Sequence, residues 1–224
     1  APALAQTAII MTSSGYQVNT INIATTGNGS TFGGAGNQKQ AGAGASSTRA
    51  VFGGGPSASD TISYYTFASA SDHTDFGDLT EGRTGTGAGS SNTRCLFMGG
   101  YTSSTSDTVD YITIANTGAA SDFGDLSTAD SEFRGTSNSV RALGVAGTAS
   151  NGAKLNNIQY FTIASTGNAS DFGDRTVTGA QVGSAANKTR ALMAARDVTS
   201  NVVDYVTIAS TGNAQDFGDL TGNK

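Results

Sequence analysis

The 224-residue sequence is short of several residue types, and each shortage excludes a class of function. Cysteine and histidine occur once each, as Cys95 and His73. An intrachain disulfide and a multi-histidine metal site are therefore excluded, and the turn sequence around His73 shows none of the partners that a histidine-based catalytic triad needs. Only two prolines are present and no Gly-x-y period exists, which excludes a collagen helix. No apolar run is long enough to span a bilayer.

Charged residues are also scarce, at 13% of the chain, and the net charge is −5. No cluster of lysine and arginine offers a surface that could follow a phosphate backbone, so we expect neither nucleic acid nor a membrane as a partner. Glycine is abundant instead, at 31 residues, together with serine, threonine and asparagine. Disordered chains often have such a composition, but here apolar runs recur at fixed spacing, which indicates a folded chain.

Two motifs recur along the sequence with one common period. The first is a Phe-Gly pair, usually inside Asp-Phe-Gly-Asp, with its phenylalanines 44, 47, 49 and 45 residues apart at Phe32, Phe76, Phe123, Phe172 and Phe217. The second is an arginine that opens an apolar run, with spacings of 45, 47 and 49 residues at Arg49, Arg94, Arg141 and Arg190. Because the two series keep the same period, the sequence predicts five copies of one structural unit.

Each copy is typical of four short strands, which are clearest in the third. There a glycine-rich strand over 83–90 leads to an apolar strand over 94–98, a third over 109–115 and a fourth over 122–126. No segment has sustained helical periodicity. The second strand is apolar at consecutive positions, so we expect both of its faces to be covered by neighbouring sheets.

These patterns predict an all-β fold, a single β-propeller of five four-stranded blades. The expected blades cover residues 1–36, 37–80, 81–127, 128–176 and 177–224. Each blade is continuous in sequence. The ring then closes by packing of the first blade on the last, or open arrays assemble between chains.

Two family resemblances accompany this architecture. The apolar run over 94–98 ends in Gly-Gly and is followed by Tyr111, which resembles a kelch repeat, although the usual tryptophan is missing. Residues 204–213 and 216–221 resemble a repeat family of tailed-phage virion proteins, with a consensus similar to DYVTIASTGNATDFGDLT … TRGVFAGG. This resemblance implies a non-enzymatic protein of the virion surface, namely a tail fibre, an adhesin or a head decoration, with other virion proteins as partners.

The repeated aspartates that close the Phe-Gly motif have three open interpretations. The residues are Asp78, Asp125, Asp174 and Asp219. Pairs such as Asp122 with Asp125 could bind calcium, whose preferred ligands are oxygens, although no EF-hand spacing is present and we otherwise expect no cofactor. The alternatives are that the carboxylates cap turn amides or form bidentate pairs with the repeated arginines, and the pairing with arginine is favoured over an arginine ring that binds anionic glycans.

Two catalytic motifs are discarded because their structural context is missing. Asp-Phe-Gly in a kinase requires a catalytic-loop aspartate and an ATP-positioning lysine on a strand, and the glycine-rich stretch over 85–89 is not followed by a helix. Cys95 is expected to be a small buried hydrophobe, and His73 to be exposed and inert. We therefore expect no enzyme activity.

The connections between the second and third strands differ between copies in length and sequence, and are the expected binding surface. They cover 55–61, 101–108, 148–157 and 197–202, represented by Ser57, Tyr101, Asn151 and Asp197. A host-surface glycan or protein is the expected partner, and a homo-oligomer is compatible with such a role. Two alternatives are a secreted glycan-binding propeller lectin, which should repeat its site residues in every blade, and a purely architectural module.

Overall fold

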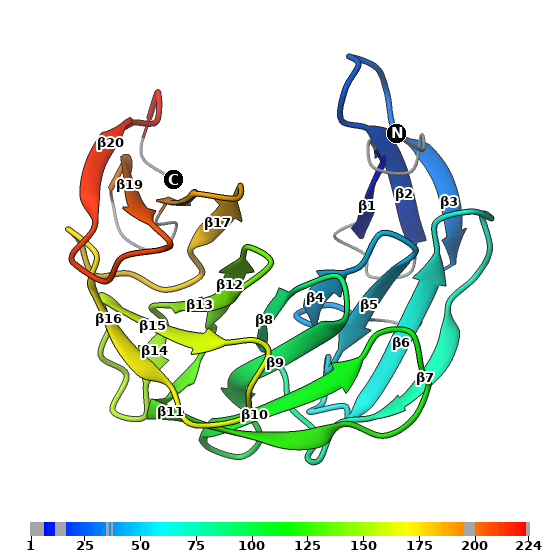
Figure 1. Cartoon of the computed structure of the whole chain (residues 1–224), viewed down its shortest axis with the longest axis horizontal. Coiled ribbons are helices and arrows are strands. Elements are labelled where there is room, and N and C mark those ends of the chain that lie inside the picture. The colour runs from blue at the N-terminus through cyan, green and yellow to red at the C-terminus, as the bar shows by residue number, and fades with distance from the viewer. Residues whose placement is uncertain (1–6, 12–16, 35, 37, 195–199, 223–224) are drawn as a thin grey trace.

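A computed structural model describes residues 7–11, 17–34, 36, 38–194 and 200–222 of the chain. Within these residues the regular structure is entirely β, with twenty strands and no helix. None of the described residues forms a helix long and apolar enough to cross a membrane. The strands form five antiparallel sheets arranged as the blades of a β-propeller, which confirms the fold that the repeats predict (Figure 1).

The strands follow the repeats in order. Their bounds are β1 (Thr7–Met11), β2 (Gln17–Asn22), β3 (Ser30–Gly34), β4 (Gly42–Ala45), β5 (Arg49–Gly53), β6 (Thr61–Thr66), β7 (Thr74–Asp78), β8 (Gly87–Ser90), β9 (Arg94–Tyr101), β10 (Thr105–Thr113), β11 (Ser121–Ser131), β12 (Arg134–Ser137), β13 (Arg141–Val145), β14 (Thr148–Ala149), β15 (Asn157–Thr162), β16 (Ser170–Asp174), β17 (Gly183–Ala186), β18 (Arg190–Ala194), β19 (Val202–Thr207) and β20 (Gln215–Asp219).

Each blade is an antiparallel meander of strands that are consecutive in the chain, with one exception. Blade 1 contains β1–β3, blade 2 contains β4–β7, and blade 5 contains β17–β20. Blade 4 has the order β12-β13-β15-β16, and its remaining strand, β14, joins the outer edge of blade 3 in the order β14-β11-β10-β9-β8. Residues 1–6, where the four-stranded repeat would place the first strand of blade 1, lie outside the described residues.

Blade 3 departs from the strand bounds expected from the sequence. β9 continues through Gly99-Gly100 to Tyr101, where the glycine pair was expected to end it, and β10 begins at Thr105. β11 continues to Ser131 because its last residues pair with β14, with Asp130 opposite Ala149. β8 begins only at Gly87, and the segment before it makes an isolated bridge between Thr84 and Tyr101 and contains the buried Arg83.

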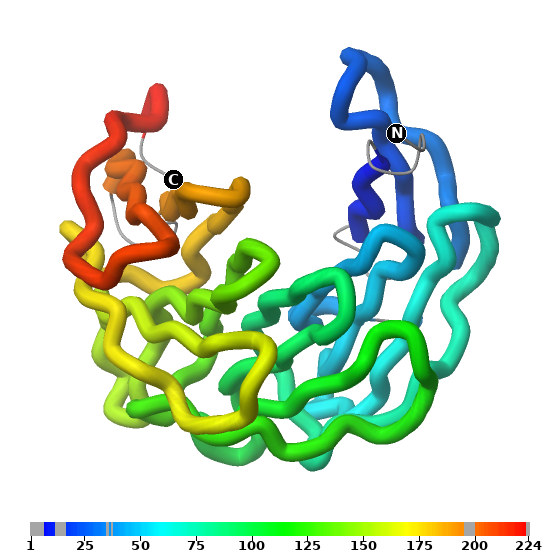
Figure 2. The backbone as a smooth tube through the Cα atoms, viewed as in Figure 1, coloured from blue at the N-terminus to red at the C-terminus, as the bar shows by residue number. Residues whose placement is uncertain are grey.

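The five blades form an open arc, with blade 1 and blade 5 at its two ends (Figures 1 and 2). The apolar core lies between neighbouring blades, in clusters that combine side chains from both. One cluster combines Leu143, Ile158 and Phe172 of blade 4 with Met193 and Ile208 of blade 5. Burial between sheets explains why the second strands are apolar on consecutive positions.

The glycine-rich first strands lie side by side along the inner edge of the arc, with β8 beside β4 and β12. A Cβ added to Gly135 would lie 2.1 Å from the carbonyl oxygen of Ala88, and one added to Gly89 would lie 2.7 Å from the Cβ of Ala142. Such distances leave no room for a side chain, so the small residues are required by the close approach of these strands.

Candidate functional site

The repeated arginines lie at the joints between neighbouring blades. The guanidinium of Arg94 lies over the ring of Tyr111, 4.7 Å from its centroid. Its Nη1 donates hydrogen bonds to the carbonyl oxygens of Ile163 (3.2 Å) and Ala164 (2.9 Å) of the next blade. Arg49 lies over Tyr64 and donates to Ile114 and Ala115, and Arg141 lies over Tyr160 and donates to Ile208. Each of these three arginines therefore joins its own third strand to the main chain of the following blade, whereas Arg190 lies over Tyr205 in blade 5, at the end of the arc.

The expected bidentate pairing of these arginines with the repeated aspartates is wrong. Arg94 is opposite Thr113, at the end of the third strand, whereas Asp125 is opposite Thr108, near its beginning. The two charges therefore lie at opposite ends of the blade. Main-chain carbonyls of the next blade, which the sequence does not mark, accept the arginine hydrogen bonds instead.

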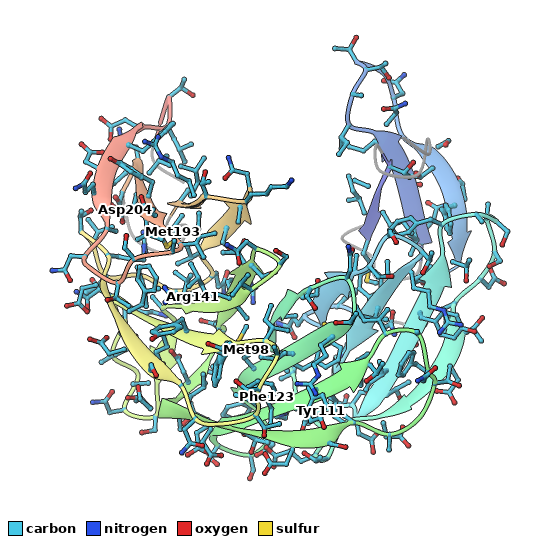
Figure 3. All side chains as sticks on the ribbon, in the orientation of Figure 1. Met98, Tyr111, Phe123, Arg141, Met193 and Asp204 are labelled. Carbon is cyan, nitrogen blue, oxygen red and sulfur yellow. The ribbon has the colours of Figure 1, made fainter. Side chains whose placement is uncertain are left out.

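The Phe-Gly pair forms the second part of each joint. Phe123 is 2% exposed and meets the ring of Tyr111 edge-on, with centroids 5.7 Å apart (Figure 3). Gly124 has a φ of 142°, and a Cβ there would lie 2.5 Å from the carbonyl oxygen of Gly167. The amide of Gly167 donates to the carbonyl of Phe123 (2.8 Å). The glycine is therefore required both by its own φ and by the approach of the next blade.

The aspartate that follows this pair acts mainly through its backbone. In blade 3 the Asp125 carbonyl accepts from the amide of Ala169 (2.8 Å), and its amide donates to the side chain of Asn168 (3.1 Å). The side chains of the four repeated aspartates are exposed, at Asp78, Asp125, Asp174 and Asp219.

The other aspartate of the motif accepts from an amide of its own strand, beside an irregularity in the strand pairing, and not from a turn amide as one of the interpretations expected. Asp122 accepts from the amide of Gly124 (3.1 Å), and Asp216 accepts from that of Gly218 (2.9 Å). Among the described residues, no group of three or more histidine, cysteine or acidic side chains could hold a metal ion.

Sequence reasoning missed a third part of the joints, which consists of buried polar side chains. Arg83 is fully buried, and its Nη2 lies 2.6 Å from the Oδ2 of Asp110. Arg83 also donates to the carbonyls of Gly99 (3.2 Å) and Thr108. Burial lowers the pKa of Arg83, while the nearby Asp110 carboxylate opposes that shift. The pair ties the segment before β8 to the middle of β10, within blade 3. The contact across the joint to blade 2 is the hydroxyl of Thr80, which donates to Asp110 Oδ1 (2.5 Å).

The position of Asp110 has the same role in the next two blades. Asp204 in blade 5 lies 3.3 Å from the Nε of the buried Arg175, and accepts from the hydroxyl of Thr176 (2.5 Å). In blade 4 the equivalent residue is Gln159, which accepts from the amide and hydroxyl of Ser127, both at 2.7 Å. Every one of these contacts crosses a joint. The signal in the sequence was the recurrence of a polar residue, Asp110, Gln159 or Asp204, between an apolar residue and a tyrosine in the third strand.

The predicted binding loops lie at the blade ends opposite the Thr-Gly turns, because the strands alternate in direction. Ser57 is exposed and has a φ of 58°, and its loop is held by a hydrogen bond from the Arg83 amide to the Ser59 carbonyl (3.0 Å). Tyr101 is 44% exposed at the tip of the β9–β10 hairpin, and Asn151 is exposed beside β14. Asp197 lies outside the described residues.

Two cavities lie beside the blades, and Pro56 of the loop over 55–61 is part of the lining of the larger one. The larger, about 710 Å³, is lined largely by apolar residues of blades 1 and 2, including Ile9, Met11 and Phe52. A second, about 380 Å³, lies among the first strands, and its polar lining includes Gln40 and Arg134. Neither cavity holds a group of acidic, cysteine or histidine residues that would suggest catalysis.

The two residues that are unique in the sequence are placed as expected. Cys95 is fully buried, and burial raises the pKa of its thiol, which favours an unreactive hydrophobe. His73 is exposed.

Comparison of the sequence with protein-family models and with curated proteins finds no match.

Proposed function

We propose that this protein is a non-enzymatic structural module of a tailed-phage virion surface, which presents variable loops to a host or virion partner. The repeat resemblance supports the phage setting. The observation that carries the binding role is the contrast between uniform joints and loops that differ from blade to blade. Ser57, Tyr101 and Asn151 are exposed in loops of three different conformations. A scaffold that repeats from blade to blade, with exposed loops that differ, is an arrangement suited to recognition.

The alternative hypothesis, a secreted lectin, is less well supported by these loops. A lectin with one sugar site in each blade would repeat a set of polar and aromatic side chains at equivalent positions. Tyr101, the exposed aromatic of blade 3, follows Arg94 by seven residues. The residue at the same distance from Arg141 in blade 4 is Thr148, so the aromatic side chain is not repeated. Titration of the purified chain with a sugar found on a glycan array separates the two hypotheses, because a lectin with one site in each blade would bind several sugars per chain, whereas dissimilar loops would not provide repeated sites.

Immunogold electron microscopy of particles from the source, with antibody against this chain, tests the virion role. Label on the tail would support an adhesin or fibre, and label on the capsid would support a decoration. Unlabelled particles, with the antigen free in the medium, would contradict the proposal and favour the lectin.

Loop replacement tests the binding role. Changing Pro56 to glycine and Tyr101, Thr102 and Asn151 to serine removes side chains from three of the loops, and attachment to the partner should fall by at least tenfold. A matched control changes the exposed turn residues Asn92 and Thr117 at the opposite end of the blades to serine, and should bind normally. Equal attachment by the loop variant and the control would show that the loops are not the binding surface.

A further inference from the structure

Each joint in the arc places an apolar side chain of one blade on the face of the blade before it. Ile114, Ile163 and Ile208 occupy the same repeat position in blades 3, 4 and 5, and are 1%, 2% and 0% exposed. They pack into the clusters that contain Phe76, Phe123 and Phe172 of the preceding blades. In blade 2 the position is taken by Phe67, which packs against the cluster of blade 1.

The two ends of the arc carry one half of this joint each. On blade 5, Phe217 is 55% exposed, whereas its four equivalents are between 2% and 7% exposed. On blade 1, Ile23 is 63% exposed, although it occupies the position of the buried isoleucines. One end therefore has an uncovered face, and the other has the side chain that covers such a face elsewhere.

The uncovered face of blade 5 is called the socket here. It is a hollow of about 310 Å³ lined by Ala185, Ala186, Asn187, Arg190, Leu192 and Phe217. Leu192 is half-buried and Arg190 is exposed, whereas their equivalents in blade 4 are a fully buried Leu143 and a half-buried Arg141. The guanidinium of Arg190 is already over the ring of Tyr205, 4.7 Å from its centroid, which is the arrangement of the completed joints.

The exposed edge of blade 1 is called the plug here, and consists of Ile23 with the turn Thr25-Thr26-Gly27-Asn28. Its sequence keeps the Thr-Gly-Asn turn of blades 4 and 5, whose glycine amides donate to Phe123 and Phe172 across the joint. The asparagine is kept as well, and in those blades it accepts from the amide of the preceding blade's aspartate (3.1 Å in both). The plug therefore retains both the side chain and the turn that a joint uses.

We propose that the plug of one copy of this chain docks on the socket of a second copy and forms a fifth joint between molecules. Ile23 covers Phe217, the Gly27 amide donates to the Phe217 carbonyl, and Arg190 donates to the carbonyls of Ile23 and Ala24. The three joints between blades 2 and 5 supply the template for each of these contacts. Large exposed apolar side chains at both ends are typical of surfaces that associate.

A second copy is favoured over closure of the chain on itself. The plug and the socket stand at separate ends of the open arc (Figures 1 and 2), and bringing them together would change the packing at the four completed joints. The contact is heterologous, because different surfaces of the two copies meet, so each new copy exposes another free end. Since each copy is itself curved, a following copy must be displaced along the arc axis, and a helical filament is expected.

Sedimentation velocity of the purified chain over a range of concentrations is the first test. Wild type should form species heavier than one chain, and Ile23→Asp and Phe217→Asp should each sediment as monomers. Both positions are exposed, so neither change disturbs the folded core. Val140→Asp, at another exposed apolar side chain of 58% exposure, is the matched control and should assemble like wild type.

Mixing the two variants distinguishes specific docking from general stickiness. Ile23→Asp keeps its socket and Phe217→Asp keeps its plug, so an equimolar mixture should form a one-to-one dimer that grows no further. Monomeric wild type at all concentrations would overturn the proposal. In a variant with Ile23→Cys and Phe217→Cys, a disulfide within one molecule would also overturn it, because the joint would then close the ring. Monomers in the mixture would also overturn it. None of these outcomes depends on the virion role.

Discussion

Neighbouring blades make different kinds of contact at the two ends of the blades. At the Thr-Gly turns, joints consist of main-chain hydrogen bonds, a glycine with positive φ and an arginine that donates to carbonyls. At the loops, they consist of side-chain contacts that differ from joint to joint: Thr80 with Asp110, Ser127 with Gln159, and Arg175 with Asp204. A main-chain contact tolerates sequence change and stays uniform, whereas a side-chain contact must be matched residue by residue.

Removal of the buried carboxylate at the loop end should have the largest effect. Asp110→Ala leaves Arg83 buried without its partner, and we expect a loss of about 3–5 kcal/mol in the free energy of unfolding. Denaturant unfolding at neutral pH measures it. Asp107→Ala, at an exposed residue of the same strand, should change stability by less than about 0.5 kcal/mol. Similar losses in both variants would show that the buried pair has no special role.

At the turn end, two glycines with the same conformation are predicted to differ in their sensitivity. Gly124 and Gly218 have φ values of 142° and 140°, but a Cβ would contact the next blade only at Gly124. Gly124→Ala should cost about 2–4 kcal/mol from strain and steric overlap, and Gly218→Ala about 1 kcal/mol from strain alone. Unfolding should be measured at low protein concentration, where blade 5 is free. Equal losses would mean that φ alone selects the glycine.

Asp130 makes the loop end dependent on pH. Burial raises its pKa to about 7, aided by the charge of Glu132 and opposed by nearby backbone amides. Because the unfolded carboxyl titrates near 3.9, the stability that the protonated form contributes is complete below about pH 4 and is lost as the pH rises to about 7. Asp130→Asn should remove this dependence and be more stable than wild type at pH 8 by on the order of 2 kcal/mol.

Thermal unfolding between pH 4 and pH 8 measures the difference, with Asp107→Asn as the exposed control. Parallel pH profiles for wild type and Asp130→Asn would contradict the assignment.

The smallest expected effect concerns the arginines at the turn end. Lysine lacks the planar guanidinium that lies over Tyr111 and the fixed geometry with which Nη1 donates to two carbonyls, so Arg94→Lys should cost about 1 kcal/mol. Arg190→Lys should cost little in the monomer, because its joint is open. The melting temperatures of the two variants measure the contrast, and an equal drop for both would locate the benefit within the blade rather than across the joint.

The fold could be predicted because its determinants are local and repeated. A phenylalanine, an arginine and a Thr-Gly turn recur with one period, and each of them contributes directly to a joint. The acceptors of the arginines could not be predicted, since carbonyls of Ile163 or Ile208 carry no signal in the sequence. The extension of β11 was also hidden, because it depends on β14, which a loop of the next blade supplies.

The buried arginines show a different limit of the repeat. Asp110 and Asp204 share one repeat position, but Arg175 directly follows its Phe-Gly-Asp motif whereas Arg83 comes five residues after Asp78. An arginine therefore reaches the repeated aspartate from two different positions in the repeat. A pattern that requires equal spacing cannot find such a pair, although the recurring aspartate marks where a partner is needed.

The joints at the turn end also affect how the number of repeats can change during evolution. A joint is made of a phenylalanine ring, an isoleucine side chain, a positive-φ glycine and main-chain groups, and each repeat of 44–49 residues carries both halves. A duplicated repeat would therefore find a matching neighbour on either side without compensating substitutions. Related genes are expected to gain or lose length in whole repeats, while their loop ends diverge by single substitutions.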